Sequence, residues 1–156
     1  MQKQILILFV ALLSVTGFAQ KSRASQFNLE NKVAIQGYDP VAYFTQKKAV
    51  KGKAAMASTY EGVTYYFSSQ ANKETFTKNP ASYEPQYGGW CAYAMGANGE
   101  KVEVDPGTFK ILDGKLYLYY NAYFNNTLKK LEQRRSQFEE KSRCELEEVC
   151  QLVFSC

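Results

Sequence analysis

The sequence contains no histidine, and that absence excludes several kinds of active site. Ser-His-Asp and Cys-His nucleophile pairs, imidazole metal sites and a proton shuttle that titrates near neutral pH all need an imidazole. Any chemistry must therefore use Cys, Tyr, Asp, Glu or Lys. Tryptophan occurs once and cysteine four times, and three of those cysteines lie close to the C-terminus.

The chain also lacks a strong excess of charge of one sign. It carries 19 Lys and Arg residues against 15 Asp and Glu residues, for a net charge of +4. These charges are dispersed and form no basic stripe, which is the usual mark of a nucleic-acid-binding surface. We therefore expect no nucleic-acid partner.

Long apolar runs are missing apart from Ile5 to Leu13. Lys3 precedes this run, and Gly17-Phe18-Ala19 follows it with the small residues that a signal peptidase inspects. The run is short for a bilayer span, so we expect a signal peptide over residues 1–19; an uncleaved N-terminal anchor is the alternative. No cysteine follows at a lipoprotein position. The mature protein is expected to be periplasmic or secreted, with no stable membrane insertion.

Aromatic residues are abundant, with 12 Tyr and 10 Phe, and one stretch concentrates the unusual residues. Gln86 to Ala94 contains Trp90, the Gly88-Gly89 pair, and Cys91, the one cysteine outside the C-terminal tail. Paired glycines let two backbone segments approach closely. We expect a tight turn that delivers Cys91 to a cramped, tyrosine-rich place.

Two segments read as β-hairpins, at residues 57–67 and 109–120. Glu61-Gly62 and Asp113-Gly114 form their turns, and Asp-Gly between strand-like runs is typical of a type I′ turn. We also expect a strand over Lys101 to Val104, after a loop from Gly96 to Gly99.

Short helices are expected between and after the hairpins. Asp39 and Pro40 fit the N-cap and first position of one helix, although Asp39 could instead serve a site directly. Ser68 or Ser69 caps a second helix, which Asn79-Pro80 ends, and Asn121 caps a last helix through Lys130. The sequence thus predicts an α+β domain over residues 33–130. Its small antiparallel sheet is built from the two hairpins with short helices packed beside it, after a flexible lead-in over residues 20–32.

Several separated blocks resemble the YHS domain family, and in particular its exported single-domain branch. The run Tyr65-Tyr66-Phe67-Ser68-Ser69 with Phe76, Asn79-Pro80 and Tyr83 carries the resemblance to the family. The resemblance to the exported branch is carried by Gly37 to Phe44, Gln86 to Ala94, Asp105-Pro106 and Asp113 to Leu118.

The resemblance has two opposite implications for chemistry. Metal-handling relatives have Phe-Cys-Ser-x-x-Cys where this chain has Phe67 to Asn72, so Ser68 and Asn72 replace both thiolates and no metal ligand is assigned. In the exported branch, the position that matches Cys91 is a cysteine or a selenocysteine. That implies a chemical use of Cys91.

From Leu131 onward the chain departs from this family, whose exported branch ends in a tryptophan-containing amphipathic helix. Reading residues 131–146 in a shifted frame, with codons chosen to permit it, yields a tryptophan-containing string like that ending. We therefore hypothesise that residues 131–156 derive from a frame shift. The alternative is a genuine divergent helix with a Cys144–Cys150 disulfide. No function is assigned to Cys144, Cys150 or Cys156.

Three functions fit these residues. The first is a small ligand-binding or accessory protein without turnover, whose aromatic pocket has Cys91 as its floor. The second is a thiol redox enzyme with Cys91 as nucleophile, set against the common role of a buried cysteine as an inert small apolar residue. The third is a metal carrier using Asp39, Asp105, Tyr38 and Cys91, which no ligand spacing requires. No cofactor is identified. The ligand-binding candidates are Tyr38, Asp39, Tyr43, Tyr87, Gly88, Gly89, Trp90 and Tyr93.

Overall fold

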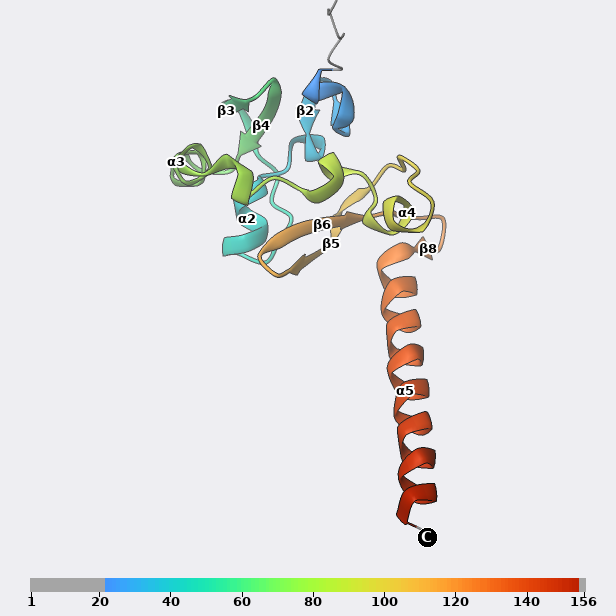
Figure 1. Ribbon diagram of the computed structural model, residues 1–156. Helices are drawn as coiled ribbons and strands as arrows, with labels where there is room; N and C mark the ends of the chain where they lie inside the picture. The colour runs from blue at the N-terminus through green and yellow to red at the C-terminus, as the bar shows by residue number, and fades with distance from the viewer. Residues whose placement is uncertain (1–21, 155–156) are drawn as a thin grey trace, which may run out of the picture.

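The computed structural model describes the backbone of residues 22–154 and the side chains as far as Lys141. The expected signal peptide at residues 1–19 lies outside the described residues, as do the side chains of Cys144, Cys150 and Cys156. Small sheets and short helices form the body of the molecule, and one long helix, α5, leaves it (Figure 1).

A four-stranded sheet forms one part of the body, with the strand order β1-β2-β4-β3. The β3–β4 hairpin is the first one expected from the sequence, and its turn residues Glu61 and Gly62 have φ values of 45° and 83°. On its other side β4 pairs in parallel with β2, through Val33 and Thr64. The strands are β1 (Leu29–Glu30), β2 (Val33–Ala34), β3 (Lys53–Tyr60) and β4 (Val63–Phe67).

The second expected hairpin forms a sheet of its own, from β5 (Asp105–Leu112) and β6 (Lys115–Tyr119). The α+β class is confirmed, and both hairpins are present, but they do not share a sheet. Strand β4 already has a partner on each edge, because the N-terminal strand β2 takes the edge opposite β3. A third hairpin follows, from β7 (Asn121–Ala122) and β8 (Asn125–Asn126).

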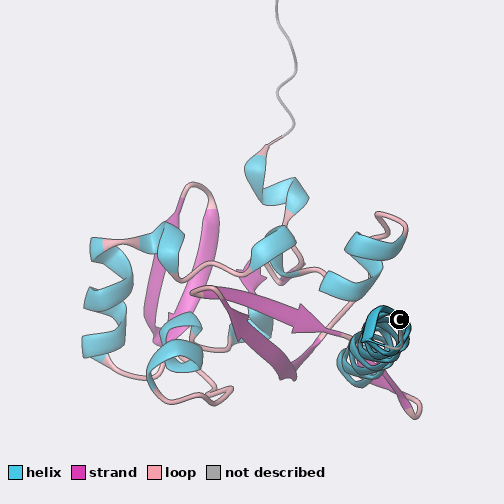
Figure 2. Cartoon of the chain, turned by 60° about the horizontal axis from the view of Figure 1, so that its bottom comes forward, coloured by secondary structure: helices cyan, strands magenta, loops and turns pink. Residues whose placement is uncertain are grey.

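Helices lie around these sheets (Figure 2). The capping predictions are confirmed, because the Asp39 carboxylate accepts hydrogen bonds from the N–H groups at the start of α2 and the Ser69 hydroxyl accepts one from Asn72 N. The α-helices are α2 (Pro40–Thr45), α3 (Gln70–Lys78), α4 (Ala92–Ala97) and α5 (Thr127–Phe154). Single 3-10 turns are η2 (Arg23–Gln26), η3 (Ile35–Gly37), η4 (Pro80–Ser82) and η5 (Gln86–Gly89).

Three local predictions after the central stretch are wrong. Gly96 belongs to α4, and Lys101 to Val104 is irregular backbone whose Val102 carbonyl accepts a hydrogen bond from Cys91 N. Asn121 pairs in β7, so the last helix begins at Thr127 instead. The cause is the extra β7–β8 hairpin, after which Asn126 Oδ1 accepts from Lys129 N and takes the capping role.

The segment expected to be a flexible lead-in, residues 20–32, is held against the domain over its described part. Arg23 forms ion pairs with Glu61 and with Glu84, at 3.0 and 2.5 Å. Its guanidinium also lies 4.5 Å from the centre of the Phe27 ring. Arg23, which lies in this polar segment, thus contacts residues that are far from it in the sequence.

One core joins the two main sheets and the helices. Tyr43 packs edge-to-face on Phe109 at 4.7 Å between ring centres, and Phe76 packs on Tyr65 and Phe67, as expected for an inward-facing Phe76. The largest fully buried apolar side chains are Tyr43, Tyr65, Phe67, Phe76, Leu116, Leu118, Val41, Val63 and Cys91.

Helix α5 extends away from this core (Figure 1). All described side chains from Leu131 to Lys141 are exposed, including Phe138 at 73%. No helix among residues 22–154 is both long and apolar enough to cross a bilayer. A helix with so little packing gains almost no stability from its neighbours. The frame-shift hypothesis for residues 131–156 remains a prediction.

We expect that ending the chain after Lys130 changes the free energy of unfolding of the domain by less than about 1 kcal/mol. The main loss would be the exposed Lys110–Glu132 ion pair, which is 2.9 Å long and of a type that contributes little. Urea unfolding of the full and shortened chains measures the difference. A loss of several kcal/mol, or of cooperative unfolding, would show that the tail supports the fold.

Candidate functional site

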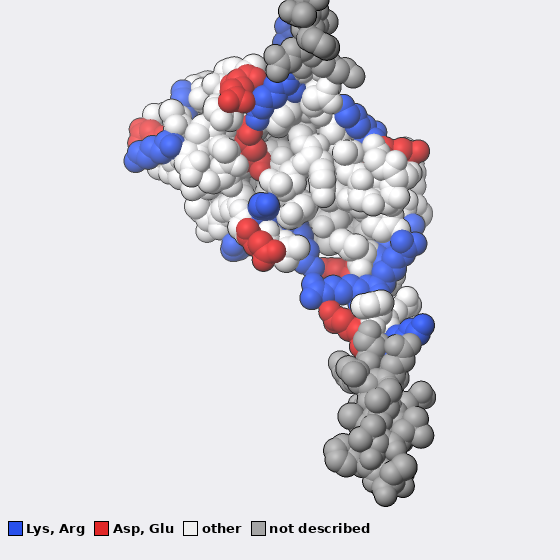
Figure 3. Space-filling view, viewed as in Figure 1, with Lys and Arg blue, Asp and Glu red and all other residues white. Residues whose placement is uncertain are grey.

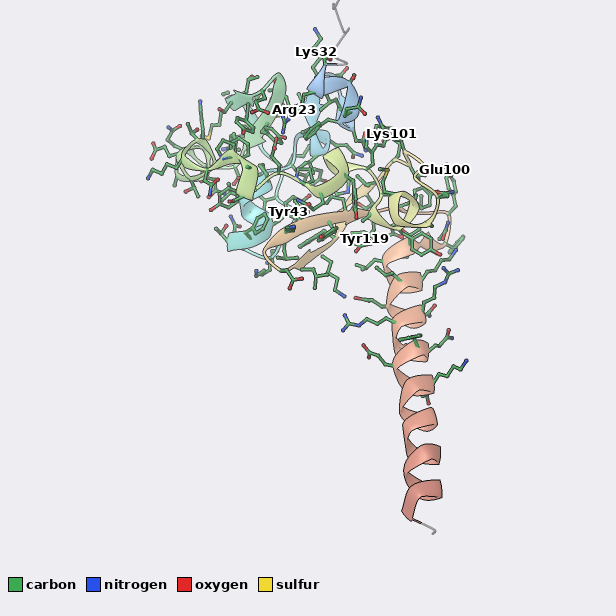
Figure 4. The ribbon with its side chains drawn as sticks, viewed as in Figure 1. Arg23, Lys32, Tyr43, Glu100, Lys101 and Tyr119 are labelled. Atoms are coloured by element: carbon green, nitrogen blue, oxygen red, sulfur yellow. The ribbon has the colours of Figure 1, made fainter. Side chains whose placement is uncertain are left out.

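The predicted site residues fall into two groups that the fold keeps apart. Tyr38, Asp39 and Tyr43 belong to the start of α2, whereas Cys91 and its neighbours belong to η5 and α4 (Figure 1). Tyr43 is part of α2, and its side chain reaches β5, where its hydroxyl donates to the carbonyl of Pro106, at 2.9 Å (Figure 4). The aromatic residues therefore do not converge on one pocket.

Cys91 is fully buried, and its thiol belongs to a closed ring of hydrogen bonds. Tyr120 N–H donates to the sulfur at 3.4 Å, and the sulfur lies 3.5 Å from Thr127 Oγ1. The Thr127 hydroxyl donates to the Tyr120 carbonyl at 3.0 Å, so the Cys91 S–H is left to donate to Thr127 Oγ1. The sulfur is thus enclosed by the chain's own atoms, which does not support a pocket with Cys91 as its floor.

The neighbours of Cys91 are also poorly suited to activate it. Burial, with a smaller contribution from Cys91 itself, raises the pKa of Tyr119 to about 12. That phenol therefore stays protonated near neutral pH and cannot take a proton from the thiol. The hydrogen bonds among Tyr120, Cys91 and Thr127 join the N-cap of α4 to the start of α5.

The Gly88-Gly89 bend leads into Cys91 and also makes room for the backbone of the N-terminal segment. Both glycines have positive φ, and a Cβ on Gly88 would lie 2.9 Å from the carbonyl oxygen of Gln26. Asn28 N donates to Gly88 O at 2.9 Å, and Trp90 Nε1 donates to Gln26 O at 2.8 Å. The close approach that paired glycines predict is confirmed, and the backbone that approaches is that of residues 26–28.

The remaining two aromatic candidates lie at the surface of this region. Tyr87 is 49% exposed and its ring centre lies 6.2 Å from that of Tyr117. The ring of Tyr93 lies beneath the guanidinium of Arg134, at 5.5 Å.

Asp39 is fully buried and accepts five hydrogen bonds. Oδ1 accepts from the N–H groups of Val41 and Ala42, at 2.9 and 3.3 Å. Oδ2 accepts from Ser68 N, Ser68 Oγ and Asn72 Nδ2, at 2.8, 2.6 and 2.7 Å. The N-cap interpretation is confirmed, and the carboxylate additionally joins α2 to the beginning of α3.

This network includes Ser68 and Asn72, the two residues that the sequence analysis compared with thiolate positions. Ser68 and Asn72 both donate to the Asp39 carboxylate, so their polar atoms are committed to a protein partner. Within the described residues, no group of three or more Cys, Asp or Glu side chains could hold a metal ion. Asp105, another residue of the metal hypothesis, accepts hydrogen bonds from Gly107 N and Thr108 Oγ1.

A hollow that the sequence reasoning missed lies beside η3. Its volume is about 280 Å³, and residues from three separate segments and Tyr66 line it. An adjoining hollow of about 360 Å³ shares Glu30 and Gln36 with it and also contacts Glu103. The first hollow is lined by Glu30, Asn31, Val33, Gln36, Gly37, Lys51, Gly52, Ala54 and Tyr66.

Two glycines shape this hollow around the Tyr66 side chain. A Cβ on Gly52 would lie 2.5 Å from the Tyr66 backbone carbon, and one on Gly37 would lie 3.2 Å from its ring. Gly52 N donates to Gly37 O at 2.9 Å, which keeps the two glycines beside each other. Little in the sequence indicated this hollow, because single glycines such as Gly37 and Gly52 are common in loops.

The backbone at the rim of the hollow is strained. Ile35 and Gln36 have φ values of 52° and 51°, a conformation that a β-branched residue such as Ile35 rarely adopts, whereas Gly37 adopts its φ of 77° without strain. Gln36 is nevertheless fixed, because its Nε2 donates to Val104 O at 3.0 Å and its carbonyl accepts from Lys51 Nζ at 2.7 Å. The Lys51 ammonium also lies 4.4 Å from the centre of the Tyr38 ring.

A third hollow lies over α3, but it is a weaker candidate. It is lined by the side chains of one helix alone, namely Gln70, Lys73, Glu74, Thr77 and Lys78. A single exposed helix face cannot enclose a ligand, whereas binding sites usually bury most of the ligand surface.

We expect Cys91 to react with iodoacetamide at least about tenfold more slowly in the folded protein than in guanidinium, because the buried sulfur becomes accessible only by local opening. Peptide mapping by mass spectrometry resolves Cys91 from the tail cysteines. Equal rates in the folded and unfolded protein would show that the sulfur is open to reagents.

We expect Asp39→Asn to lower the free energy of unfolding by about 3 kcal/mol, because an amide nitrogen would face hydrogen-bond donors in a buried site. Asp113→Asn is the matched control, since Asn-Gly also suits a type I′ turn, and should change stability by less than about 0.5 kcal/mol. Denaturant unfolding of both variants measures the effect. Equal small losses would mean that the Asp39 network contributes little.

Comparison with known proteins assigns part of this region to a family. No curated protein and no solved structure matches the chain. The family model described as the YHS domain matches residues 41–87, a segment that begins in α2 and ends in η5. The chain therefore contains a YHS domain, and the Ser68 and Asn72 partners of Asp39 lie inside it.

Proposed function

We propose that the protein is an exported accessory domain that binds a small polar ligand without converting it, in the hollow beside η3. The observation that carries the proposal is the left-handed backbone of Ile35 and Gln36, which leads into the hollow that Gln36 lines. Strained backbone costs about 1–3 kcal/mol per residue and tends to occur where a ligand is bound.

The chemistry of the lining supports a polar ligand. Asn31 and Gln36 offer amide groups, Lys51 an ammonium group, and Glu30 a carboxylate, around the Tyr66 side chain. A ligand with both hydrogen-bond donors and acceptors, such as an amino acid or a sugar, would match these groups. The volume of about 280 Å³ suits a molecule of that size.

We propose binding without catalytic turnover because of the surroundings of Cys91. The chain has no histidine, and the thiol of Cys91 is enclosed and engaged with Tyr120 and Thr127. The hollow beside η3 has its own lining, to which Cys91 does not contribute. The proposed binding site and the buried sulfur of Cys91 therefore share no lining residue. Export rests on the apolar run near the N-terminus and is part of the same proposal.

The test is a titration of the ¹⁵N-labelled protein with free amino acids and monosaccharides. We expect at least one of them to shift the amide signals of Gln36, Gly37 and Gly52 in a saturable way. Lys51→Ala should weaken that binding by about fivefold or more, through loss of a charge-assisted hydrogen bond. Lys73→Ala, in the hollow over α3, is the matched control and should leave it unchanged. Shifts confined to other residues, or equal weakening by both variants, would contradict the proposal.

A further inference from the structure

The tip of the β7–β8 hairpin presents two adjacent aromatic side chains to solvent. Tyr123 is 92% exposed and Phe124 is fully exposed, at 111% of the reference value. Both residues have positive φ, at 49° and 61°, so they form a two-residue turn that holds the pair at the end of the hairpin. Two neighbouring large apolar groups at a projecting tip cost solubility unless they meet a partner.

The tip is also the outermost point on its side of the molecule. Figure 2, in which α5 is seen nearly end-on, shows the hairpin projecting past that helix. A flat surface that touches the tip could therefore run alongside α5 without meeting the body first. This geometry suits a planar partner better than a pocket that closes around the tip.

Basic side chains accompany the aromatic pair. Lys129 and Lys130 lie on the first turn of α5, both exposed, and neither has a carboxylate partner among residues 22–141. Arg134 follows one turn later and is exposed as well. The space-filling view shows Lys and Arg gathered where α5 leaves the body (Figure 3). The acidic Glu132 and Glu139 on the same helix are paired with Lys110 and Arg135.

Lys129 is close enough to act together with the aromatic tip. Two strand residues and the start of α5 separate it from Phe124. At about 3.4 Å per extended residue and 1.5 Å per helical residue, the Cα atoms lie within about 14 Å. Lys129 and the aromatic tip can therefore contact the same bilayer surface.

We propose that Tyr123 and Phe124, together with Lys129, Lys130 and Arg134, form a peripheral docking surface for an anionic phospholipid bilayer. Aromatic side chains favour the interfacial layer of a membrane, and lysine and arginine are attracted to anionic headgroups. The two contributions together suffice for reversible binding without a spanning helix. This surface is separate from the proposed ligand site in its residues and in its partner.

The test is flotation of the full chain with vesicles of phosphatidylglycerol mixed with phosphatidylcholine, compared with vesicles of phosphatidylcholine alone. We expect binding to the anionic vesicles that is at least about tenfold stronger and that falls as salt is raised. The double variant Tyr123→Ser with Phe124→Ser should lose about tenfold in vesicle binding. Its thermal unfolding should be unchanged, because fully exposed side chains carry no packing.

The matched control is Phe138→Ser, which removes an exposed aromatic side chain from α5 well beyond the hairpin. It should change vesicle binding by less than about twofold. Equal binding to both kinds of vesicle, an unaffected double variant, or an equal loss with Phe138→Ser would overturn the proposal. So would a dimer in solution that the double variant converts to monomer, because the partner would then be a second copy of the chain.

Discussion

The buried carboxylate of Asp39 is the interaction on which the arrangement of the YHS segment depends. A charge this deep is tolerated only when its lone pairs are filled, and five donors from α2, Ser68 and Asn72 fill them. The same contacts fix the position of α2 against α3, and with it the Tyr38–Lys51 side of the molecule. Ser68 and Asn72 are thereby committed to the Asp39 carboxylate.

The unusual residues of the central stretch are explained by a second set of internal contacts. The glycine pair admits the backbone of residues 26–28, Trp90 fixes that backbone by one hydrogen bond, and Cys91 closes a ring with Tyr120 and Thr127. Each of these residues, which suggested chemistry in the sequence, therefore makes specific contacts within the protein itself. The hollow beside η3 and the uncovered aromatic turn of β7–β8 lie outside these contacts, and they carry the two proposals.

The sequence predicted local structure well where the chemistry of a turn or cap acts over a few residues. Asp39 with Pro40, Ser69, and the Asp113-Gly114 turn are cases in which the side chain itself selects the backbone conformation. Pairings between distant segments were not predictable in this way. The parallel pairing of β2 with β4, for example, depends on which strand of the whole chain packs against the edge of β4 that β3 leaves open. The hollow beside η3 was missed because its lining comes from separated segments and has no common motif.

The central claim is that a ligand occupies the hollow beside η3 and leaves Cys91 untouched. A crystal structure of the protein, purified from its own producing cell without extensive dialysis, tests this most directly. The account predicts density for a small molecule against Tyr66, within reach of Gln36 and Lys51, and an unmodified sulfur at Cys91. Density bonded to that sulfur or lying against it, with the hollow holding only water, would contradict it.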